Sequence, residues 1–381
     1  MGKGKRKGKG KGKLRATFRK KHESKQRVRD VTRSFREHDP DIDEAPGSER
    51  VSGKGSLSRK KTVVGTWVEG EEGSFEVVPE VDSTRCIPGR VLAVRGLISE
   101  VVTDDNTVYE CATRRLLKTL ATDDRHVVVA GDRVMFRPVN EREGVIERVE
   151  PRRGVLGRMV RGRRHVIVAN VDRIAIVASV AQPALKPNLI DRLLVAAEAS
   201  NIEPLICFNK IDLIEPAELQ TLAGVYGQLG YRVFFLSATT GFGIQRLVAE
   251  VAHRQTVFVG QSGVGKSSLL NAIDPSLRLR VAHVSRSTEK GRHTTTTATL
   301  IPFARGGYLV DTPGIRQMQL WDVIPEELAT LFREFRPYVN HCRFPDCTHT
   351  HELDCGVKAA VAAGKVDLRR YDSYCHLFSG D

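Results

Sequence analysis

One eight-residue stretch constrains the fold of this chain more than any other feature. Residues 260–267 read Gly-Gln-Ser-Gly-Val-Gly-Lys-Ser, which fits the pattern G-x-x-x-x-G-K-[ST] between an apolar stretch and a helical one. Such a loop follows a β-strand and precedes a helix, whose N-terminus helps the backbone N–H groups to surround a phosphate. The pattern therefore predicts a parallel α/β domain that binds a nucleotide. We expect contacts to the nucleotide from Gly260, Gln261, Ser262, Gly263, Val264, Gly265, Lys266, Ser267 and Ser268.

Two side chains of this loop have distinct predicted roles. Lys266 would reach the β- and γ-phosphates, and the Ser267 hydroxyl would bind Mg²⁺. The loop alone does not distinguish ATP from GTP, so an ATP-using enzyme is the alternative at this point.

The choice of base depends on Asn209-Lys210-Ile211-Asp212, which follows an apolar stretch at residues 204–208. An aspartate carboxylate accepts paired hydrogen bonds from the ring N–H and the exocyclic amine of guanine, whereas adenine has no such edge. Asp212 would therefore select GTP over ATP. On its own the tetrapeptide is a weak signal, because an aspartate here is more often an ordinary helix N-cap.

Two further segments complete the predicted nucleotide site. Ser237 and Ala238 follow the next apolar stretch and can present a backbone N–H to the guanine carbonyl. The motif Asp311-Thr-Pro-Gly314 follows another apolar strand, and we expect Asp311 to support the Mg²⁺ ion. The backbone N–H of Gly314 would contact the γ-phosphate.

Catalytic roles are predicted for Lys266, His293 and Thr295. Residues 291–297 read Gly-Arg-His-Thr-Thr-Thr-Thr, and we expect Thr295 to bind Mg²⁺ when the γ-phosphate is present. A run of strand-forming threonines is the alternative. Ile315 stands where many GTPases have a water-orienting glutamine, and isoleucine cannot hydrogen-bond to water. We therefore expect slow unassisted hydrolysis, with the water aligned by His293, by an outside group or by both; a solvent-exposed loop histidine is the alternative.

The order of these motifs along the chain is unusual. Small GTPases ordinarily present the P-loop first, then the threonine segment, D-T-x-G, N-K-x-D and S-A-x. Here the last two precede the P-loop. Because a compact sheet can be opened at a surface loop without losing its pairings, the order indicates a circularly permuted chain that builds the same site.

The net charge of +14 is concentrated at one end of the chain. Residues 1–61 hold 21 of the 60 Lys and Arg residues and 8 of the 46 Asp and Glu residues, so they carry +13. The alternating Lys and Gly of residues 2–13 cannot bury apolar surface, and we expect a disordered tail there. Such a tail neutralises phosphates without reading bases, which predicts RNA or another polyanion as its partner. A purely solubilising extension is the alternative.

The remaining composition predicts a cytoplasmic protein. No stretch approaches the roughly 18 consecutive apolar residues of a membrane span, and the N-terminus lacks the apolar core of a secretory signal. Four of the seven cysteines are scattered and three are clustered, unlike the even framework of a secreted disulfide scaffold. We expect no membrane partner and a monomer.

The pattern along the chain predicts a multidomain fold. Short alternating strands between residues 88 and 158 predict a small closed barrel, with an OB-type barrel as the first choice; it would carry RNA on one face or serve only as a spacer. From residue 159 apolar strands, the first over 166–180, alternate with helical stretches as in a parallel sheet. We predict a basic tail at 1–62, a linker at 63–87, the OB-like barrel at 88–158, a circularly permuted P-loop α/β GTPase domain at 159–320 and a small helical zinc-binding domain at 321–381.

The C-terminal domain is predicted from a cluster of metal-binding residues. Cys342, Cys347, His349 and Cys355 offer three thiolates and one imidazole within a 14-residue loop. These ligands suit one tetrahedral Zn²⁺ and leave no open position, which indicates a structural site. His341 and His351 are competing imidazoles, and a reduced loop without metal is the alternative.

Together these features closely resemble the ribosome small subunit-dependent GTPase A family. The resemblance covers roughly residues 88–378 and rests on the permuted motifs, on Gly131-Asp-Arg-Val134, on Gly291-Arg-His-Thr-Thr-Thr and on the Cys/His cluster, whose spacing matches the family's own. It implies a GTPase that binds the small ribosomal subunit late in its maturation, contacts rRNA through the barrel and is stimulated by the particle. The long Lys/Gly tail exceeds the family pattern, so the resemblance assigns it no role.

Two alternative functions stay open at this stage besides the ATP-using enzyme. One is a GTP-controlled assembly factor that binds RNA and the ribosome and in which hydrolysis only resets binding. The other is an RNA-binding protein with a degenerate P-loop, against which the intact Lys266, Ser267, Asp311 and Asp212 argue.

Overall fold

A computed structural model describes residues 11–17, 60–69, 75–79, 81–82, 84–114, 117, 127–160, 163–279, 298–311 and 325–380. The chain forms two compact units, Met1–Arg153 and Gly154–Asp381. The division lies shortly before residue 158, the predicted end of the barrel. The five domain bounds given above stay predictions.

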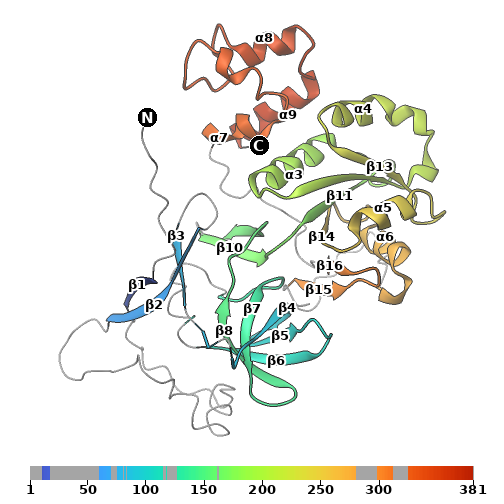
Figure 1. Ribbon diagram of the computed structural model, residues 1–381. Helices are drawn as coiled ribbons and strands as arrows, with labels where there is room; N and C mark the ends of the chain where they lie inside the picture. Colours follow the sequence, from blue (N-terminus) through green and yellow to red (C-terminus); the bar gives the residue numbers. More distant parts are fainter. Residues whose placement is uncertain are drawn as a thin grey trace, which may run out of the picture. The chain divides into compact units, whose positions relative to one another are not determined.

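The first unit contains a closed five-stranded barrel (Figure 1). Its strands are β4 (Ile87–Arg95), β5 (Ile98–Val102), β6 (Val108–Thr113), β7 (Arg133–Pro138) and β8 (Glu143–Val149). They pair in the order β4-β5-β6-β8-β7, and β7 closes the barrel on β4. All these pairs are antiparallel except β6 with β8, which run parallel. This is the OB-type barrel that the sequence predicts.

Apolar side chains from all five strands fill the barrel, and two glycines make room for them. A Cβ atom on Gly144 would lie 2.7 Å from the ring of Phe136, and one on Gly89 would lie 2.5 Å from Val101. Glycine therefore lets the strands approach these side chains closely. The fully buried core residues include Val91, Val101, Cys111, Phe136 and Ile146.

A buried ion pair fixes the turn that leads into β7. The carboxylate of Asp132, which is fully buried, accepts hydrogen bonds from Nε and Nη2 of Arg152 at 2.8 and 2.9 Å. It also accepts one from the backbone N–H of Val129 at 2.8 Å, while Arg152 donates another to the carbonyl oxygen of Val127. The carboxylate thus ties the end of the barrel to the turn 20 residues earlier.

A second sheet in the first unit falls where the sequence predicts a tail and a linker. The antiparallel strands β1 (Lys11–Thr17), β2 (Lys60–Glu69) and β3 (Phe75–Pro79) pair with β2 in the middle. The prediction weighed net charge, whereas β2 and β3 are rich in β-branched and aromatic residues that favour strands, such as Trp67 opposite Val77. The rest of residues 1–59 lies outside the described part, so disorder there stays a prediction.

The second unit is built on a mostly parallel sheet. Its strands pair in the order β13-β12-β11-β14-β16-β15, and only the β15–β16 pair is antiparallel. The hairpin β9 (Leu156–Val160) and β10 (Arg163–Val168) precedes the sheet. The strand predicted over 166–180 is therefore two strands, with Asn170 in the left-handed conformation between them (φ 58°). The sheet strands are β11 (Arg173–Ser179), β12 (Glu203–Asn209), β13 (Arg232–Leu236), β14 (Arg254–Val259), β15 (Thr299–Pro302) and β16 (Gly307–Asp311).

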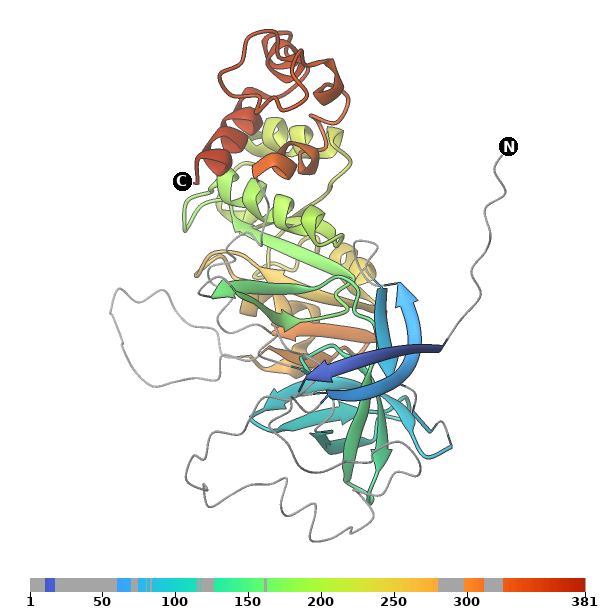
Figure 2. The same cartoon turned by 90° about the vertical axis from the view of Figure 1, so that its left-hand side faces the viewer.

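Helices cover both faces of this sheet. On one face α5 (Ile244–Val251) and α6 (Lys266–Ile273) pack against Ala175 and Val177 of β11. On the other face lie α3 (Pro187–Ala199) and α4 (Gln220–Gln228), as Figures 1 and 2 show. Because consecutive strand residues point to opposite faces, β11 is buried on both sides, which explains its continuous apolar sequence.

The C-terminal part of the second unit is helical and lies beside α3 (Figure 2). It comprises α7 (Pro325–Leu331), α8 (Gly356–Ala362) and α9 (Leu368–Ser379). The buried rings of Phe332, Phe335 and Tyr374 form its centre, with centroids 5.0 to 5.5 Å apart. Val195 of α3 belongs to the same apolar cluster, so this part is packed directly on the sheet's helical layer.

Among the described residues, every helix is too short or too polar to cross a membrane.

The buried pair of Asp132 and Arg152 leads to a stability prediction. We expect Asp132→Asn to lower the free energy of unfolding of the barrel by about 3 kcal/mol, because it removes the fully buried charge that accepts two hydrogen bonds from the guanidinium of Arg152. Hydrogen exchange of the barrel amides in increasing urea measures this. Asp104→Asn, in an exposed turn of the same barrel, is the matched control and should change stability by less than about 0.5 kcal/mol. Equal losses in both variants would contradict the assignment.

Candidate functional site

Five strands of the second unit end at one edge of the sheet. Strands β11, β12, β13, β14 and β16 run parallel, so their carboxyl ends share the edge at which open α/β sheets bind ligands. Residues 209–212 begin at the end of β12, residues 237–238 follow β13, and residues 260–268 lead from β14 into α6. Asp311 is the last residue of β16. The fold therefore gathers the predicted nucleotide-binding segments despite their order in the chain.

Glycines give the loop after β14 its tight curl. Gly260, Gly263 and Gly265 have φ angles of +144°, +83° and +95°. A Cβ atom on Gly260 would lie 2.1 Å from the carbonyl oxygen of Val177, and one on Gly265 would lie 2.4 Å from the side-chain amide of Asn209. No other residue fits these two places, because both the backbone conformation and the space exclude a side chain.

The charge inside this loop belongs to Lys266, the first residue of α6. Its ammonium donates hydrogen bonds to the carbonyl oxygens of Gly260 and Gln261, both at 2.8 Å, so it lies across the loop. Ser267 and Ser268 follow it in the first turn of α6. Residues 260–268 contain no carboxylate. A lysine ammonium, a helix N-terminus and a glycine loop without acidic residues fit a polyphosphate.

Two side chains, one at the end of β12 and one directly after it, hold the glycine loop in place. Asn209, 1% exposed, donates a hydrogen bond from Nδ2 to the carbonyl oxygen of Val264 at 2.8 Å. Its Oδ1 accepts one from the backbone N–H of Ala238 at 3.3 Å. Lys210 donates hydrogen bonds from Nζ to the carbonyl oxygens of Gly263, at 2.8 Å, and Gln182. Three segments far apart in the sequence are thereby tied together by side chains that the sequence assigned only to base recognition.

The loop after β13 is closed by its own serine. Ser237, fully buried, accepts a hydrogen bond on Oγ from the backbone N–H of Thr240, and its own N–H donates to the carbonyl oxygen of Phe242. The turn leaves Ala238 beside Asn209. Ile211 is buried, whereas Asp212, just after the end of β12, is exposed. A base can therefore reach its carboxylate.

Four predicted residues have limited or no description in the structure. His293, Thr295 and Gly314 lie outside the described residues. The backbone of Asp311 is described and pairs with Thr299 of β15. Their catalytic and metal-binding roles stay predictions.

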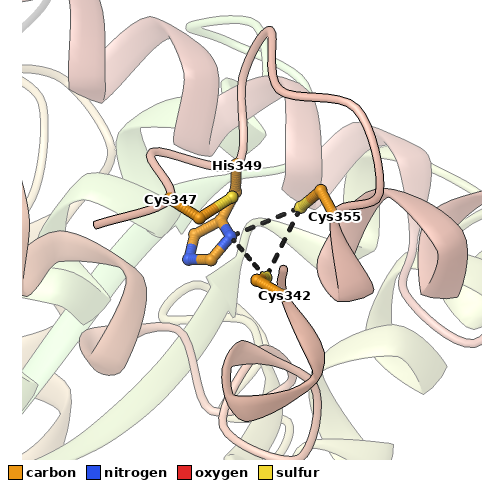
Figure 3. Close-up of side chains that lie close together, drawn as sticks. All are labelled: Cys342, Cys347, His349 and Cys355. Carbon is orange, nitrogen blue, oxygen red and sulfur yellow. Dashed lines mark hydrogen bonds between the residues drawn. The ribbon is translucent and has the colours of Figure 1, made fainter. Parts of the chain in front are cut away.

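The four predicted metal ligands come together in the C-terminal part (Figure 3). One ligand atom from each of Cys342, Cys347, His349 and Cys355 lies within 4.8 Å of the others. The Sγ atoms of Cys342 and Cys355 are 3.8 Å apart, and Nδ1 of His349 is 3.4 Å from each. Neither His341 nor His351 belongs to the group. Cys355 also caps the first turn of α8, which fixes one corner of the cluster.

These distances fit a tetrahedral metal ion. Zinc–sulfur bonds of about 2.3 Å and zinc–nitrogen bonds of about 2.0 Å place tetrahedral ligand atoms about 3.5 to 3.8 Å apart. Burial raises the pKa of the Cys347 thiol to about 12 and lowers the pKa of His349. The imidazole is thus kept neutral, the form that binds metals, and the thiols ionise when a cation compensates for their burial.

Side chains that the sequence analysis did not single out support this cluster. Tyr371 and Tyr374 of α9 donate hydrogen bonds at 2.8 and 2.7 Å to the carbonyl oxygens of His349 and Thr348. The carboxylate of Glu352 accepts hydrogen bonds from the backbone N–H groups of Thr348 and Thr350. The spacing of the two tyrosines could have predicted that they share one face of a helix. It could not have predicted their partners, which are more than 20 residues away in the sequence.

Comparison with known proteins identifies the family. The model of the family described as RsgA GTPase matches residues 149–321, which include all the strand ends of the nucleotide edge. A protein of Sodalis glossinidius named small ribosomal subunit biogenesis GTPase RsgA is 41% identical over 300 residues, which are 76% of this chain and 84% of that protein. The chain belongs to the RsgA GTPase family.

Two solved structures agree with the fold. The crystal structure of YjeQ from Thermotoga maritima is 35% identical, with a TM-score of 0.66 over 77% of this chain and 98% of that one. That of YloQ, described as a circularly permuted GTPase, is 30% identical, with a TM-score of 0.62 over 79% and 97%. The predicted family and the predicted fold class, a barrel followed by a circularly permuted GTPase and a small Cys/His-containing helical part, are confirmed. The chain is a GTPase, with GTP and GDP as its nucleotides.

The hydrogen bonds of Asn209 lead to a binding prediction. We expect Asn209→Ala to weaken GDP binding about 10- to 100-fold, because it leaves the Val264 carbonyl and the Ala238 N–H without their partner and frees the glycine loop. Titration with fluorescently labelled GDP measures this. Asn140→Ala removes a similar side chain that accepts two backbone hydrogen bonds in the barrel and should leave the affinity unchanged. If Asn209→Ala bound GDP as tightly as the unmodified protein, the hydrogen bonds of Asn209 would not be what holds the glycine loop for the nucleotide.

Proposed function

We propose that this protein hydrolyses GTP in the late maturation of the small ribosomal subunit and that the subunit stimulates its turnover. The observation that carries this is the convergence of the N-K-I-D, S-A-T and glycine-loop segments at one sheet edge in a member of the RsgA GTPase family. Two relatives that are 41% and 42% identical to this chain bear the name small ribosomal subunit biogenesis GTPase RsgA. Because these names refer to small-subunit biogenesis, we propose the small ribosomal subunit as the partner of this protein.

The nucleotide is held by the segments already described. In this proposal Asp212 pairs with the guanine edge and Ala238 offers its N–H to the guanine carbonyl. The N–H groups of residues 260–268 and the ammonium of Lys266 bind the phosphates, with Asn209 and Lys210 keeping the loop in register. Ser267 and Thr295 would bind Mg²⁺, Asp311 would support it, and Gly314 would contact the γ-phosphate. When bound, the ion neutralises charge on the β- and γ-phosphates.

Hydrolysis then depends on charge stabilisation and on the position of one water molecule. Lys266 stabilises the charge that builds up on the phosphate oxygens, which is the main part of phosphoryl-transfer catalysis. Ile315 offers no hydrogen bond to water. We therefore assign water alignment to His293, to a group of the ribosomal particle, or to both.

The Cys/His cluster holds one structural zinc ion in this proposal. Four protein ligands leave no position for a substrate, and the ligand spacing matches a closed tetrahedral site. The ion would add to the apolar cluster around Phe332, Phe335 and Tyr374 by fixing the loop that carries the four ligands.

RNA is the proposed ligand of the barrel and of the basic tail. OB-type barrels bind nucleic acids on one face, and the tail carries +13 over 61 residues. We propose a cytoplasmic monomer that contacts rRNA of the small subunit through these parts.

The zinc assignment predicts a specific metal loss. We expect about one zinc per purified chain, and Cys355→Ser should lose most of it, because one of four ligands becomes a poor one. Elemental analysis after dialysis measures the content. Cys375→Ser, a half-buried thiol of the same helical part outside the cluster, is the control and should retain the metal. Equal zinc content in both variants would remove Cys355 from the ligand set.

The experiment that tests the function is GTP hydrolysis with and without small ribosomal subunits, with large subunits as the control. We expect slow turnover alone and at least about tenfold stimulation by small subunits only. His293→Ala should abolish most of that stimulation while GTP affinity holds. Tight GTP binding without stimulation would keep the nucleotide site and reject the partner, and unchanged stimulation in His293→Ala would reject the histidine.

A further inference from the structure

One stripe along helix α3 faces the C-terminal part of the chain. Its four residues recur every three or four positions, so they share one side of the helix. Two of them are carboxylates, both of which bind arginines from the C-terminal part. The stripe consists of Asn188, Asp191, Val195 and Glu198.

Asp191 is the centre of this contact. Its side chain is fully buried and accepts four hydrogen bonds, three of them from α9. The guanidinium groups of Arg369 and Arg370 donate at 2.7 and 2.8 Å, and the hydroxyl of Ser373 donates at 2.6 Å. The fourth donor is the hydroxyl of Tyr226 in α4, at 2.7 Å.

Arg370 connects Asp191 to a second buried carboxylate. It is fully buried and donates to both carboxylate oxygens of Glu334, at 2.6 and 3.1 Å. Burial alone would lower the pKa of its guanidinium, but the hydrogen bonds and charges of Glu334 and Asp191 raise it above the ordinary value. The guanidinium therefore stays charged and holds both carboxylates.

The far end of the stripe is fixed by a second arginine pair. Glu198, mostly buried, accepts hydrogen bonds from Nε of Arg333 at 2.6 Å and from Nη2 of Arg336 at 2.9 Å. Arg333 also lies over the ring of Tyr231, 4.1 Å from its centroid. The C-terminal part thus binds α3 through ion pairs at Asp191 and at Glu198, and Val195 packs against it between these two residues.

The opposite side of α3 faces the nucleotide loop much more loosely. A crevice lies between Leu189, Ile190 and Leu193 of α3 and the loop residues Gly260, Gln261 and Val264. It encloses about 20 Å³, room for about one water molecule. Ser179 also lines it, is 2% exposed, and its hydroxyl has no hydrogen-bond partner among the described residues. This seam is not close-packed.

Helix α9 continues the connection to the Cys/His cluster. One of its sides carries Arg369, Arg370 and Ser373 to α3. Another side carries Tyr371 and Tyr374, which donate to the carbonyl oxygens of the ligand His349 and of Thr348. A single helix therefore contacts both the metal loop and the helix that borders the nucleotide loop.

We propose that α3 and α9 form one rigid lever that couples nucleotide binding at residues 260–268 to the Cys/His cluster, with Asp191 and Arg370 as positioning residues. Breaking a buried charge pair is strongly unfavourable, whereas a small shift across an imperfectly filled crevice loses only a few weak contacts. Because Gly260, Gln261 and Val264 line the same crevice as α3, a rearrangement of the glycine loop that closes the crevice displaces α3, and α9 follows. Since the proposal concerns the same nucleotide site, it rests on the proposed function.

The test is hydrogen exchange of the full chain without nucleotide, with GDP and with a non-hydrolysable GTP analogue. In the unmodified protein we expect nucleotide to slow exchange at residues 260–268 and, about fivefold, at residues 368–379. Asp191→Asn should keep the first effect and reduce the second, the ratio at residues 368–379, to near one. The milder Ser373→Ala, which removes one of the three α9 donors to Asp191, should reduce that ratio only in part. Arg343→Gln breaks an exposed ion pair in the metal loop and should behave like the unmodified protein. Zinc content is measured in each variant.

The nucleotide-dependent ratio separates coupling from mere stability. If Asp191 only stabilised the fold, Asp191→Asn would speed exchange in α9 equally with and without nucleotide, and the ratio would stay near five. That result, or an unmodified protein in which nucleotide protects residues 260–268 but not α9, would overturn the coupling alone. No protection at residues 260–268 would overturn the proposed function and the coupling with it.

Discussion

The parallel pairing of β11, β12, β13, β14 and β16 is the constraint on which the rest of the second unit depends. In a parallel sheet the carboxyl ends of all strands lie at the same edge. Each segment that follows a strand therefore lies along that edge, next to the others. The order of the segments along the chain does not enter this argument. A permuted chain can therefore build the same site, provided that β14 keeps its place between β11 and β16.

Convergence at an edge does not by itself make a site, because loops at a sheet edge must also be held in position. Here the last side chain of β12 and the one after it do this. Asn209 reaches the glycine loop and the turn after β13, and Lys210 reaches the glycine loop and the turn after β11. Each bond is to a backbone group, so it fixes the path of the chain and not merely one side chain. Since Asn209 and Lys210 hold these loops, Asp212 is not needed to hold them. Its exposed carboxylate is available for a base.

The sequence was sufficient where function is encoded in contacts close along the chain. The glycines of residues 260–265 and the four Cys/His ligands lie within short segments, so their spacing alone predicts the loop and the cluster. The sequence was insufficient where a high charge hid a strand or where a long apolar run hid a break between two strands. Strand β1 lies in a stretch dominated by lysine and glycine, and Asn170 divides an apolar run into β10 and β11 through a left-handed turn. The pairing of Asp191 with Arg370 spans 179 residues, and no local pattern indicates which of many arginines is the partner.

The same pairing raises the question of why an interface inside one compact unit contains two fully buried charges. Apolar side chains of equal volume would be at least as stabilising, since removing charges from water is costly. Apolar contacts are non-directional, however, and two helices packed only by Val195 and its neighbours could slide by a fraction of a turn at little cost. The bidentate contact of Arg370 with Glu334 and its bond to Asp191 fix the position of the planar guanidinium, because all three hydrogen bonds form together in only one geometry. The charges therefore fix the register of α9 on α3, which is the property that a lever between two sites requires.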